Sequence, residues 1–170
     1  MSFGFFGCWN RELCEDKIPP RDIVINILKQ NVTSLDMKRL IVAGDNIYQL
    51  ETDEGKLYRK QTVRSGFKKL NELGIPVDMI LGNHDEEDCI VDYEKEQAKR
   101  FPNIHLYDFH TMRLENVNII YINTNSVDME VSEETSKYKS LDMILDYLRK
   151  HMEKDVLNVV VGPVSYTHLR

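Results

Sequence analysis

The sequence predicts a single α/β domain in which a layered β-sheet core is flanked by helices. Two observations lead to this prediction. Short apolar runs at residues 2–7, 39–44, 77–82 and 157–162 each stop at a glycine, which is typical of strands buried on both faces. The first three of these glycines are almost equally spaced along the chain, as successive βαβ crossovers would be. A length of 170 residues also matches about one domain.

Helical periodicity appears between these strands. Pro19 and Pro20 mark the start of a first helix, whose buried face is expected to carry Ile23, Val24, Ile27 and Leu28. A second helix is predicted at 55–73, with Val63, Phe67 and Leu70 on one face. A short charged helix is predicted at 92–101, where Pro102 ends it.

The second half of the chain predicts a hairpin and one long helix. Residues 107–125 resemble a hairpin that turns at Glu115 and Asn116, and its second strand is the apolar run 117–122. A helix is predicted at 132–154 with Ser132 as its cap. Its apolar stripe is expected to contain Leu141, Ile144, Leu145, Leu148 and Met152.

Composition excludes several classes of protein. Hydrophobic residues make up 42% and charged residues 29%, so the chain is neither collagenous nor wholly disordered. A net charge of −6 disfavours nucleic acid and anionic membranes as main partners. The three cysteines, Cys8, Cys14 and Cys89, lack the spacing of a disulfide framework, and neither a signal peptide nor a membrane span is evident. A cytoplasmic location with reduced thiols is therefore expected.

Polar residues follow the glycines that end the first three strands. In open α/β sheets, ligands bind beyond the carboxyl ends of the strands, so these residues are the candidates for chemistry. Their thiol, carboxylate, amide, phenol and imidazole groups suit a metal such as Mn, Fe or Zn. The candidates are Cys8, Trp9 and Asn10 after the first strand, Asp45, Asn46 and Tyr48 after the second, and Asn83, His84 and Asp85 after the third.

Each candidate also has an ordinary structural interpretation. Gly44, Asp45 and Asn46 could form a simple turn, and Cys8 could be a small buried residue. Trp9 is expected in the core or in a pocket wall. The acidic run 85–88 is expected to be solvated beyond its first residue. The remaining histidines of the domain are expected in loops or on helix surfaces, and they are His105, His110 and His151.

The strand-end motifs resemble the calcineurin-like metallophosphoesterase superfamily, and within it the purple acid phosphatase branch. That branch carries Gly-Asp-Trp-Gly, Gly-Asp-Asn-x-Tyr and Gly-Asn-His-Asp blocks. The corresponding residues here are Gly7-Cys8-Trp9-Asn10, Gly44-Asp45-Asn46-Ile47-Tyr48 and Gly82-Asn83-His84-Asp85. The resemblance runs from about residue 3 to 162, and it implies an α/β/β/α sandwich.

The resemblance also implies a mechanism. Asp45 would bridge two metal ions (Fe, Mn or Zn), Tyr48 would ligate the first ion and Asn83 the second. His84 would contact the phosphate or leaving group of a small phosphorylated substrate, and Asp85 would orient His84. A hydroxide that bridges the two ions would hydrolyse the ester.

The chain departs from the family pattern in two places. Cys8 stands where the family has a metal-binding Asp, so Cys8 is a candidate ligand and Asn10 a candidate ligand or a neighbouring donor. The later Gly-His and Gly-His-x-His motifs are absent, because Gly162 is followed by Pro163. Residues 163–170 resemble a non-native tail, which also removes His168 from the candidate ligands. We expect residues 1–162 to be the N-terminal part of a metallophosphoesterase domain that is truncated and impaired.

Two alternatives from other functional classes stay open. The chain could be a non-catalytic remnant of the fold that binds metal or phosphate. Thiol redox chemistry at Cys8 and Cys14 is a weaker alternative, because their spacing is not that of a Cys-x-x-Cys motif.

Overall fold

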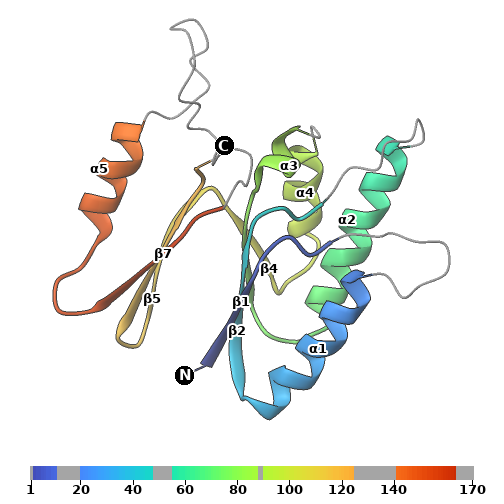
Figure 1. The fold of residues 1–170 in the computed structure, drawn as a ribbon, viewed down its shortest axis with the longest axis horizontal. Coiled ribbons are helices and arrows are strands. Elements are labelled where there is room, and N and C mark those ends of the chain that lie inside the picture. Colours follow the sequence, from blue (N-terminus) through green and yellow to red (C-terminus); the bar gives the residue numbers. More distant parts are fainter. Residues whose placement is uncertain (1, 11–19, 48–54, 88–89, 125–140, 164–170) are drawn as a thin grey trace, which may run out of the picture.

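The computed structural model describes residues 2–10, 20–47, 55–87, 90–124 and 141–163 (Figure 1). Its first sheet is parallel, in the order β1 (Ser2–Phe6), β2 (Met37–Ala43), β3 (Val77–Ile80) and β4 (Ile104–Tyr107). Its second sheet contains β5 (Phe109–Leu114), β6 (Val117–Ile122) and β7 (Leu157–Val161). Strand β6 is antiparallel to β5 and parallel to β7. The predicted strands are confirmed, and the hairpin turns at Glu115, which has a φ of 51°.

Helices cover the outer face of each sheet. Helices α1 (Pro20–Ser34), α2 (Gly55–Asn71) and α4 (Val91–Ala98) lie on the first sheet, and α5 (Leu141–His151) lies beside the second (Figure 1). A fifth helix, α3 (Asn83–Glu87), follows β3 directly. The layer order is therefore helix, sheet, sheet, helix, which confirms the predicted α/β sandwich.

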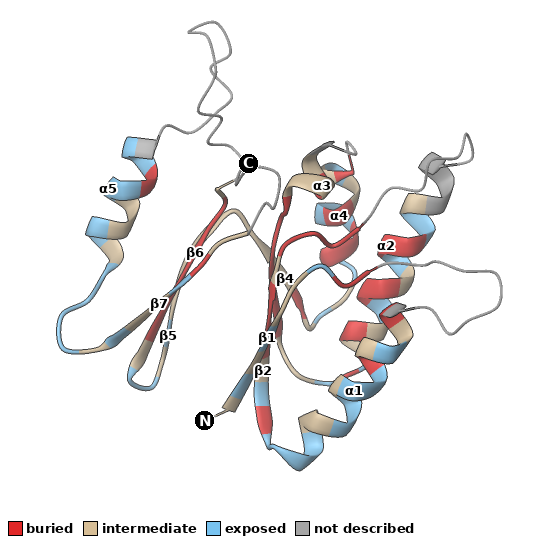
Figure 2. Cartoon of the chain, in the orientation of Figure 1, coloured by how far each residue is buried: buried red, intermediate tan, exposed pale blue. Residues whose placement is uncertain are grey.

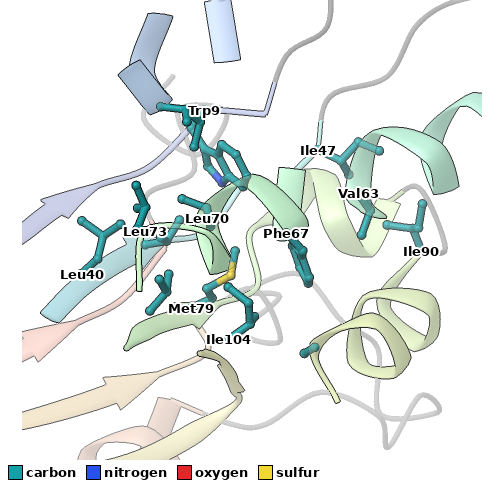
Figure 3. Packing of buried hydrophobic residues seen from close by; sticks show 14 of the residues in the cluster. Trp9, Leu40, Ile47, Val63, Phe67, Leu70, Leu73, Met79, Ile90 and Ile104 are labelled. Atoms are coloured by element: carbon teal, nitrogen blue, oxygen red, sulfur yellow. The ribbon is translucent and has the colours of Figure 1, made fainter. Parts of the chain in front are cut away.

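The largest apolar cluster lies between the first sheet and its helices (Figure 3). Val63, Phe67 and Leu70 of α2 are fully buried there, as their helical spacing predicts. They pack against Trp9 and against side chains of the strands, including Leu40, Val42, Met79 and Ile104. Burial of Trp9 at 2% exposure confirms its predicted place in the core.

A second apolar cluster fills the space between the sheets. Its buried members are Ile41, Ile80, Ile119, Tyr121 and Val161. Alternate residues of β2, β3 and β6 therefore face opposite layers, and these central strands are buried on both sides (Figure 2). The predicted burial on both faces is wrong for the edge strands β1 and β7, where Phe5 and Leu157 are 61% and 62% exposed.

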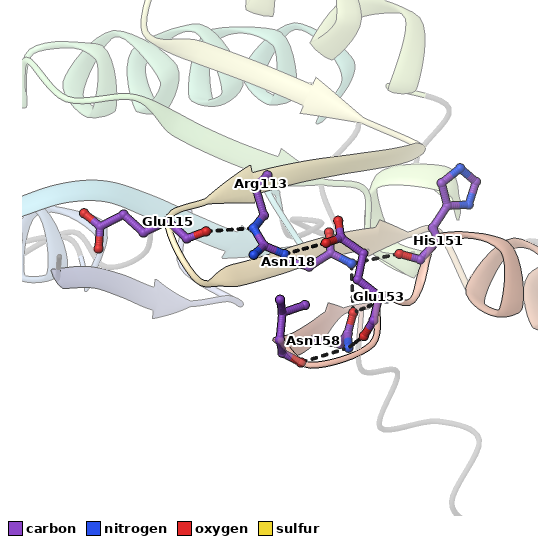
Figure 4. A network of polar contacts seen from close by, with 7 residues as sticks. Arg113, Glu115, Asn118, His151, Glu153 and Asn158 are labelled. Atoms are coloured by element: carbon purple, nitrogen blue, oxygen red, sulfur yellow. Dashed lines mark hydrogen bonds and ion pairs between the residues drawn. The ribbon is translucent and has the colours of Figure 1, made fainter.

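A polar network fixes the turn between α5 and β7 (Figure 4). The side-chain amide of Asn118 on β6 donates to the His151 carbonyl and to Asn158 Oδ1, each at 2.8 Å. Asn158 in turn donates to the Glu153 carbonyl at 2.8 Å. Arg113 pairs with the Glu153 carboxylate at 2.5 Å. These contacts attach the end of α5 and the start of β7 to the hairpin.

Three structural expectations need correction. The buried face of α1 carries Arg21, Ile25, Leu28 and Val32 rather than Ile23 and Ile27, which are 49% and 52% exposed. Arg21 is polar yet buried, so an apolar pattern alone could not find this stripe. On α5, Ile144 and Leu148 pack inward but Leu145 is exposed, and Met152, which follows the helix, is also exposed. His105 and His110 lie in strands β4 and β5, not in loops.

The predictions for the rest of the long helix, including the Ser132 cap, fall on residues outside the described ranges. The predicted tail from residue 164 onward also lies outside them. Pro163 is described, and its carbonyl accepts a hydrogen bond from Thr124 Oγ1 at 3.2 Å. Within the described part of the chain, no helix has the length and apolar character needed to cross a lipid bilayer.

Candidate functional site

Strands β1, β2 and β3 are neighbours in the parallel sheet, so the segments that follow them meet at one edge. Their approach is close enough to require glycine. A Cβ on Gly44 would lie 2.9 Å from the Gly82 Cα, and Gly44 has a φ of +79°. A Cβ on Gly7 would lie 3.1 Å from the Ala43 carbonyl oxygen. The glycines that end the three strands therefore allow the loops to pack directly on one another.

Cys8 and Asp45 form a direct side-chain contact at this edge. The Cys8 thiol donates a hydrogen bond of 3.2 Å to Asp45 Oδ2. Both residues have left-handed backbones, with φ values of 53° and 52°. Cys8 is exposed, whereas Asp45 is only 6% exposed. The pair thus places a sulfur atom at the surface with a carboxylate directly below it.

Asp45 also lies against the start of α3. A Cβ on Gly82 would come within 2.1 Å of Asp45 Oδ1, so only a glycine leaves room for this carboxylate. The next residues, Asn83 and His84, form the first turn of α3 and are half-buried. The structure therefore brings together four of the predicted site residues, which are Cys8, Asp45, Asn83 and His84.

Asp85 is completely buried and serves as a hydrogen-bond acceptor for both loops. Its Oδ1 accepts the backbone N–H groups of Asn46 at 2.8 Å and Ile47 at 3.1 Å. Its Oδ2 accepts the Gly82 N–H at 2.6 Å and the Asn46 side-chain amide at 3.2 Å. Burial raises the pKa of Asp85 above its ordinary value, and the nearby Asp45 charge adds to this rise. The three backbone N–H groups act in the opposite direction.

Asn46 connects these loops to the core. Its side-chain amide donates to the Ile80 carbonyl at 3.0 Å as well as to Asp85, and its oxygen accepts the Trp9 indole N–H at 3.5 Å. The sequence marked Asn46 only as part of a polar block. The same polar block could equally form a simple turn, so nothing in the sequence indicated that Asn46 connects the loops to the core.

Asn10 lies on the α2 side of this edge. Its side-chain amide donates to the Thr62 carbonyl at 3.2 Å, and its oxygen accepts from Arg21 at 3.5 Å. A Cβ on Gly66 would lie 2.6 Å from the Asn10 amide nitrogen. A glycine inside a helix is unfavourable by itself, so Gly66 was a sequence signal for this close contact. Asn10 therefore anchors the β1 loop to α1 and α2.

Several predicted residues lie elsewhere. Tyr48, Cys14, Cys89 and His168 fall outside the described ranges. His110 stacks on Tyr107 at a centroid distance of 4.1 Å, and His151 stacks on Tyr147 at 4.0 Å. Glu86, expected to be solvated, accepts a hydrogen bond of 3.1 Å from Asn123.

The donor atoms at this edge fit a metal ion in part. Thiol, carboxylate and amide donors suit zinc or iron, and Cys8 and Asp45 already touch. Within the described ranges, however, no group of three or more His, Cys, Asp or Glu side chains could hold a metal ion. A complete centre would require additional ligands.

Comparisons with known proteins show the fold. No protein-family model and no curated protein matches this sequence. One solved crystal structure aligns with 95% of this chain and 68% of its own, at 13% identity and a TM-score of 0.60. The protein TT1561 of Thermus thermophilus aligns with 92% of this chain and 64% of its own, at 10% identity and a TM-score of 0.55. An archaeal phosphodiesterase aligns with 96% of this chain and 84% of its own, at 13% identity and a TM-score of 0.51.

These similarities establish a shared α/β sandwich at low sequence identity. The chain spans about two thirds of the length of the first two structures. One neighbour with this fold is a phosphodiesterase, so the architecture is one that carries phosphoesterase activity in another protein.

Proposed function

We propose that this chain forms part of a metal-dependent phosphoesterase that hydrolyses small phosphate esters. The observation that carries the proposal is the contact of 3.2 Å between Cys8 and Asp45 beside the Gly82-Asn83-His84 segment. Candidate ligands from three separate strand ends thereby share one edge of the sheet. The fold shared with an archaeal phosphodiesterase supports the same assignment.

Asp45, Asn83 and Cys8 are the residues we expect to hold metal, and Tyr48 remains a predicted ligand. The proposed centre would hold two ions, chosen from Fe, Mn and Zn, with the Asp45 carboxylate among their ligands. Bound metal ions would offset the negative charge of the phosphate and favour ionisation of a water molecule. Because Cys8 replaces a carboxylate, its sulfur would shift the preference toward zinc or iron over manganese.

His84 is the residue we expect to act on the leaving group. It lies one residue after Asn83 in α3 and is half-buried, so it adjoins the proposed metal position while remaining accessible. As a hydroxide oxygen derived from water bonds to phosphorus, the ester P–O bond breaks and its electron pair passes to the leaving oxygen. A proton from the His84 imidazole would neutralise that oxygen. Asp85 accepts its four hydrogen bonds from Gly82, Asn46 and Ile47, so we do not retain the predicted orientation of His84 by Asp85.

The substrate is expected to be a small phosphomonoester. The net charge of −6 disfavours a large polyanion such as nucleic acid. The purified chain is incubated with p-nitrophenyl phosphate and with bis-p-nitrophenyl phosphate, after loading with Mn, Fe or Zn. Preference for the first compound would support a monoesterase, and preference for the second would show a diesterase.

Asp45→Asn is the decisive variant in this assay, with Asp36→Asn as its matched control. Asp36 has a similar left-handed φ of 47°, but it lies just before β2, at the opposite end from Asp45. We expect hydrolysis to require metal, to stop with chelator and to fall at least about 100-fold in Asp45→Asn only. Hydrolysis that survives both chelation and Asp45→Asn would refute the proposal.

A non-catalytic role is the second candidate. It is favoured by the lack of a group of three His, Cys, Asp or Glu ligands within the described residues. In that case the chain would bind a metal ion or inorganic phosphate only weakly and without turnover. Calorimetric titration separates the two, because tight binding of two ions per chain would contradict the non-catalytic role.

A further inference from the structure

We propose that Asp85 is a positioning residue that holds the Asp45 carboxylate against Cys8. This inference rests on the proposed function only in treating Asp45 as the central group of the site. Asp85 reaches Asp45 through the backbone that flanks it. Its four hydrogen bonds come from Asn46 and Ile47, the two residues that follow Asp45 in the chain, and from Gly82, which packs against Asp45.

The Oδ1 half of Asp85 fixes the backbone conformation of Asp45. Gly44 and Asp45 both have positive φ values, 79° and 52°, and a non-glycine residue in this region is strained. That conformation turns the next two N–H groups, of Asn46 and Ile47, toward the same oxygen of Asp85. Both groups are buried, so losing their acceptor would leave two unsatisfied donors and remove what holds the turn.

The Oδ2 half fixes the distance between the β2 and β3 loops. It accepts the Gly82 N–H at 2.6 Å and the Asn46 side-chain amide at 3.2 Å. Gly82 is the residue against which Asp45 Oδ1 lies. One carboxylate therefore sets both the turn that carries Asp45 and the surface on which Asp45 rests.

Reactivity of the Cys8 thiol reports this positioning without any metal. Cys8 is exposed, and its thiol donates a hydrogen bond to Asp45 Oδ2 that restrains the sulfur atom beside the carboxylate. If Asp45 moves away, this hydrogen bond is lost and alkylation becomes faster. The measurement is the rate of reaction with iodoacetamide at neutral pH, in a chain that carries Cys14→Ser and Cys89→Ser so that only Cys8 reacts.

Two variants at Asp85 give a graded test. Asp85→Asn keeps an oxygen for the Asn46 and Ile47 N–H groups but places a donor where Oδ2 accepts two hydrogen bonds. Asp85→Ala removes all four hydrogen bonds that the Asp85 carboxylate accepts. We expect alkylation of Cys8 to accelerate roughly tenfold in Asp85→Ala and by a smaller factor in Asp85→Asn.

Asp78→Asn is the matched control, because Asp78 is an equally buried carboxylate of β3 that contacts Arg39 and Tyr121 instead. It should leave the alkylation rate unchanged. Amide chemical shifts of Asn46, Ile47 and Gly82 should move in both Asp85 variants and not in the control. Wild-type alkylation rates in a folded Asp85→Asn or Asp85→Ala chain would overturn the inference, whether or not the protein hydrolyses phosphate esters. If Asp85→Ala fails to fold, Asp85→Asn decides the question.

Discussion

Tyr121 of β6 donates a hydrogen bond of 2.9 Å to the carboxylate of Asp78 on β3, and this bond crosses the apolar layer between the two sheets. Both residues are fully buried. Asp78 also accepts two hydrogen bonds from Arg39, at 2.7 and 2.8 Å. Burial, together with the Asp78 charge, raises the pKa of Tyr121, so its hydroxyl stays protonated as the donor.

Tyr121→Phe removes this inter-sheet hydrogen bond while keeping the ring. We expect a loss of about 2 kcal/mol in the free energy of unfolding, since a hydrogen bond to a charged group is lost inside the core. Urea unfolding measures this value. Tyr147→Phe, whose hydroxyl contacts Thr111 at a half-buried site, should cost less. Equal losses in the two variants would contradict a special role for the Tyr121–Asp78 bond.

His110 makes stability depend on pH. Burial lowers its pKa below 6.5, although the Asp78 charge acts in the opposite direction. The unfolded chain therefore binds more protons at His110 than the folded chain. The resulting stabilisation is complete above pH 6.5 and is lost as pH falls through the folded-state pKa.

The pH effect is measured by urea unfolding of the wild type and His110→Gln at pH 8 and pH 5. The wild type should lose more stability over this interval than the variant. NMR titration of the His110 ring should give a midpoint below 6.5. Parallel losses in the two proteins would show that another group causes the pH dependence.

Gly82→Ala should disturb the candidate site directly. The added Cβ would lie 2.1 Å from Asp45 Oδ1 and 2.2 Å from the Asp45 nitrogen. We expect a loss of about 3 kcal/mol in the free energy of unfolding, from overpacking. Gly74→Ala is the matched control. Gly74 has a φ of +73° and nothing within 4 Å, so backbone strain alone should cost about 1 kcal/mol. A smaller loss at Gly82 than at Gly74 would mean that the loops are not packed in this way.

The exposed face of edge strand β1 should promote self-association. Phe3 and Phe5 are 38% and 61% exposed, and the strand carries no charged residue. Uncharged apolar edge strands pair readily with other chains. Phe5→Lys should therefore reduce the sedimentation-measured mass at high protein concentration. Ile23→Lys, at a similarly exposed position on α1, should have little effect. An equal reduction in mass in both variants would indicate that the added lysine acts through general solubility and not through strand pairing.

Sequence patterns predicted α2 and every described strand except β4, because β2, β3 and β6 are buried on both faces and Val63, Phe67 and Leu70 mark one helical stripe. They also predicted α1 but placed its buried face incorrectly, because Arg21 is buried there among apolar residues. They missed α3, whose five residues are all polar or charged. Short polar helices carry no hydrophobic periodicity.

At the site, the motifs predicted that Cys8, Asp45, Asn83 and His84 would gather at one edge, because parallel strands end on the same side. They did not predict that Asp85 would bind the backbone of the Asp45 loop. That function depends on the left-handed turn at Gly44 and Asp45, which local sequence does not specify.

Cobalt titration tests the central claim, that Cys8 and Asp45 together hold a metal ion, because a thiolate bound to Co²⁺ gives a sulfur-to-metal absorption band. We predict that this band appears in the wild type and in Asp36→Asn, disappears in Cys8→Ser and weakens in Asp45→Asn. A band that persists in Cys8→Ser, or a wild-type spectrum identical to that of free Co²⁺, would contradict the claim.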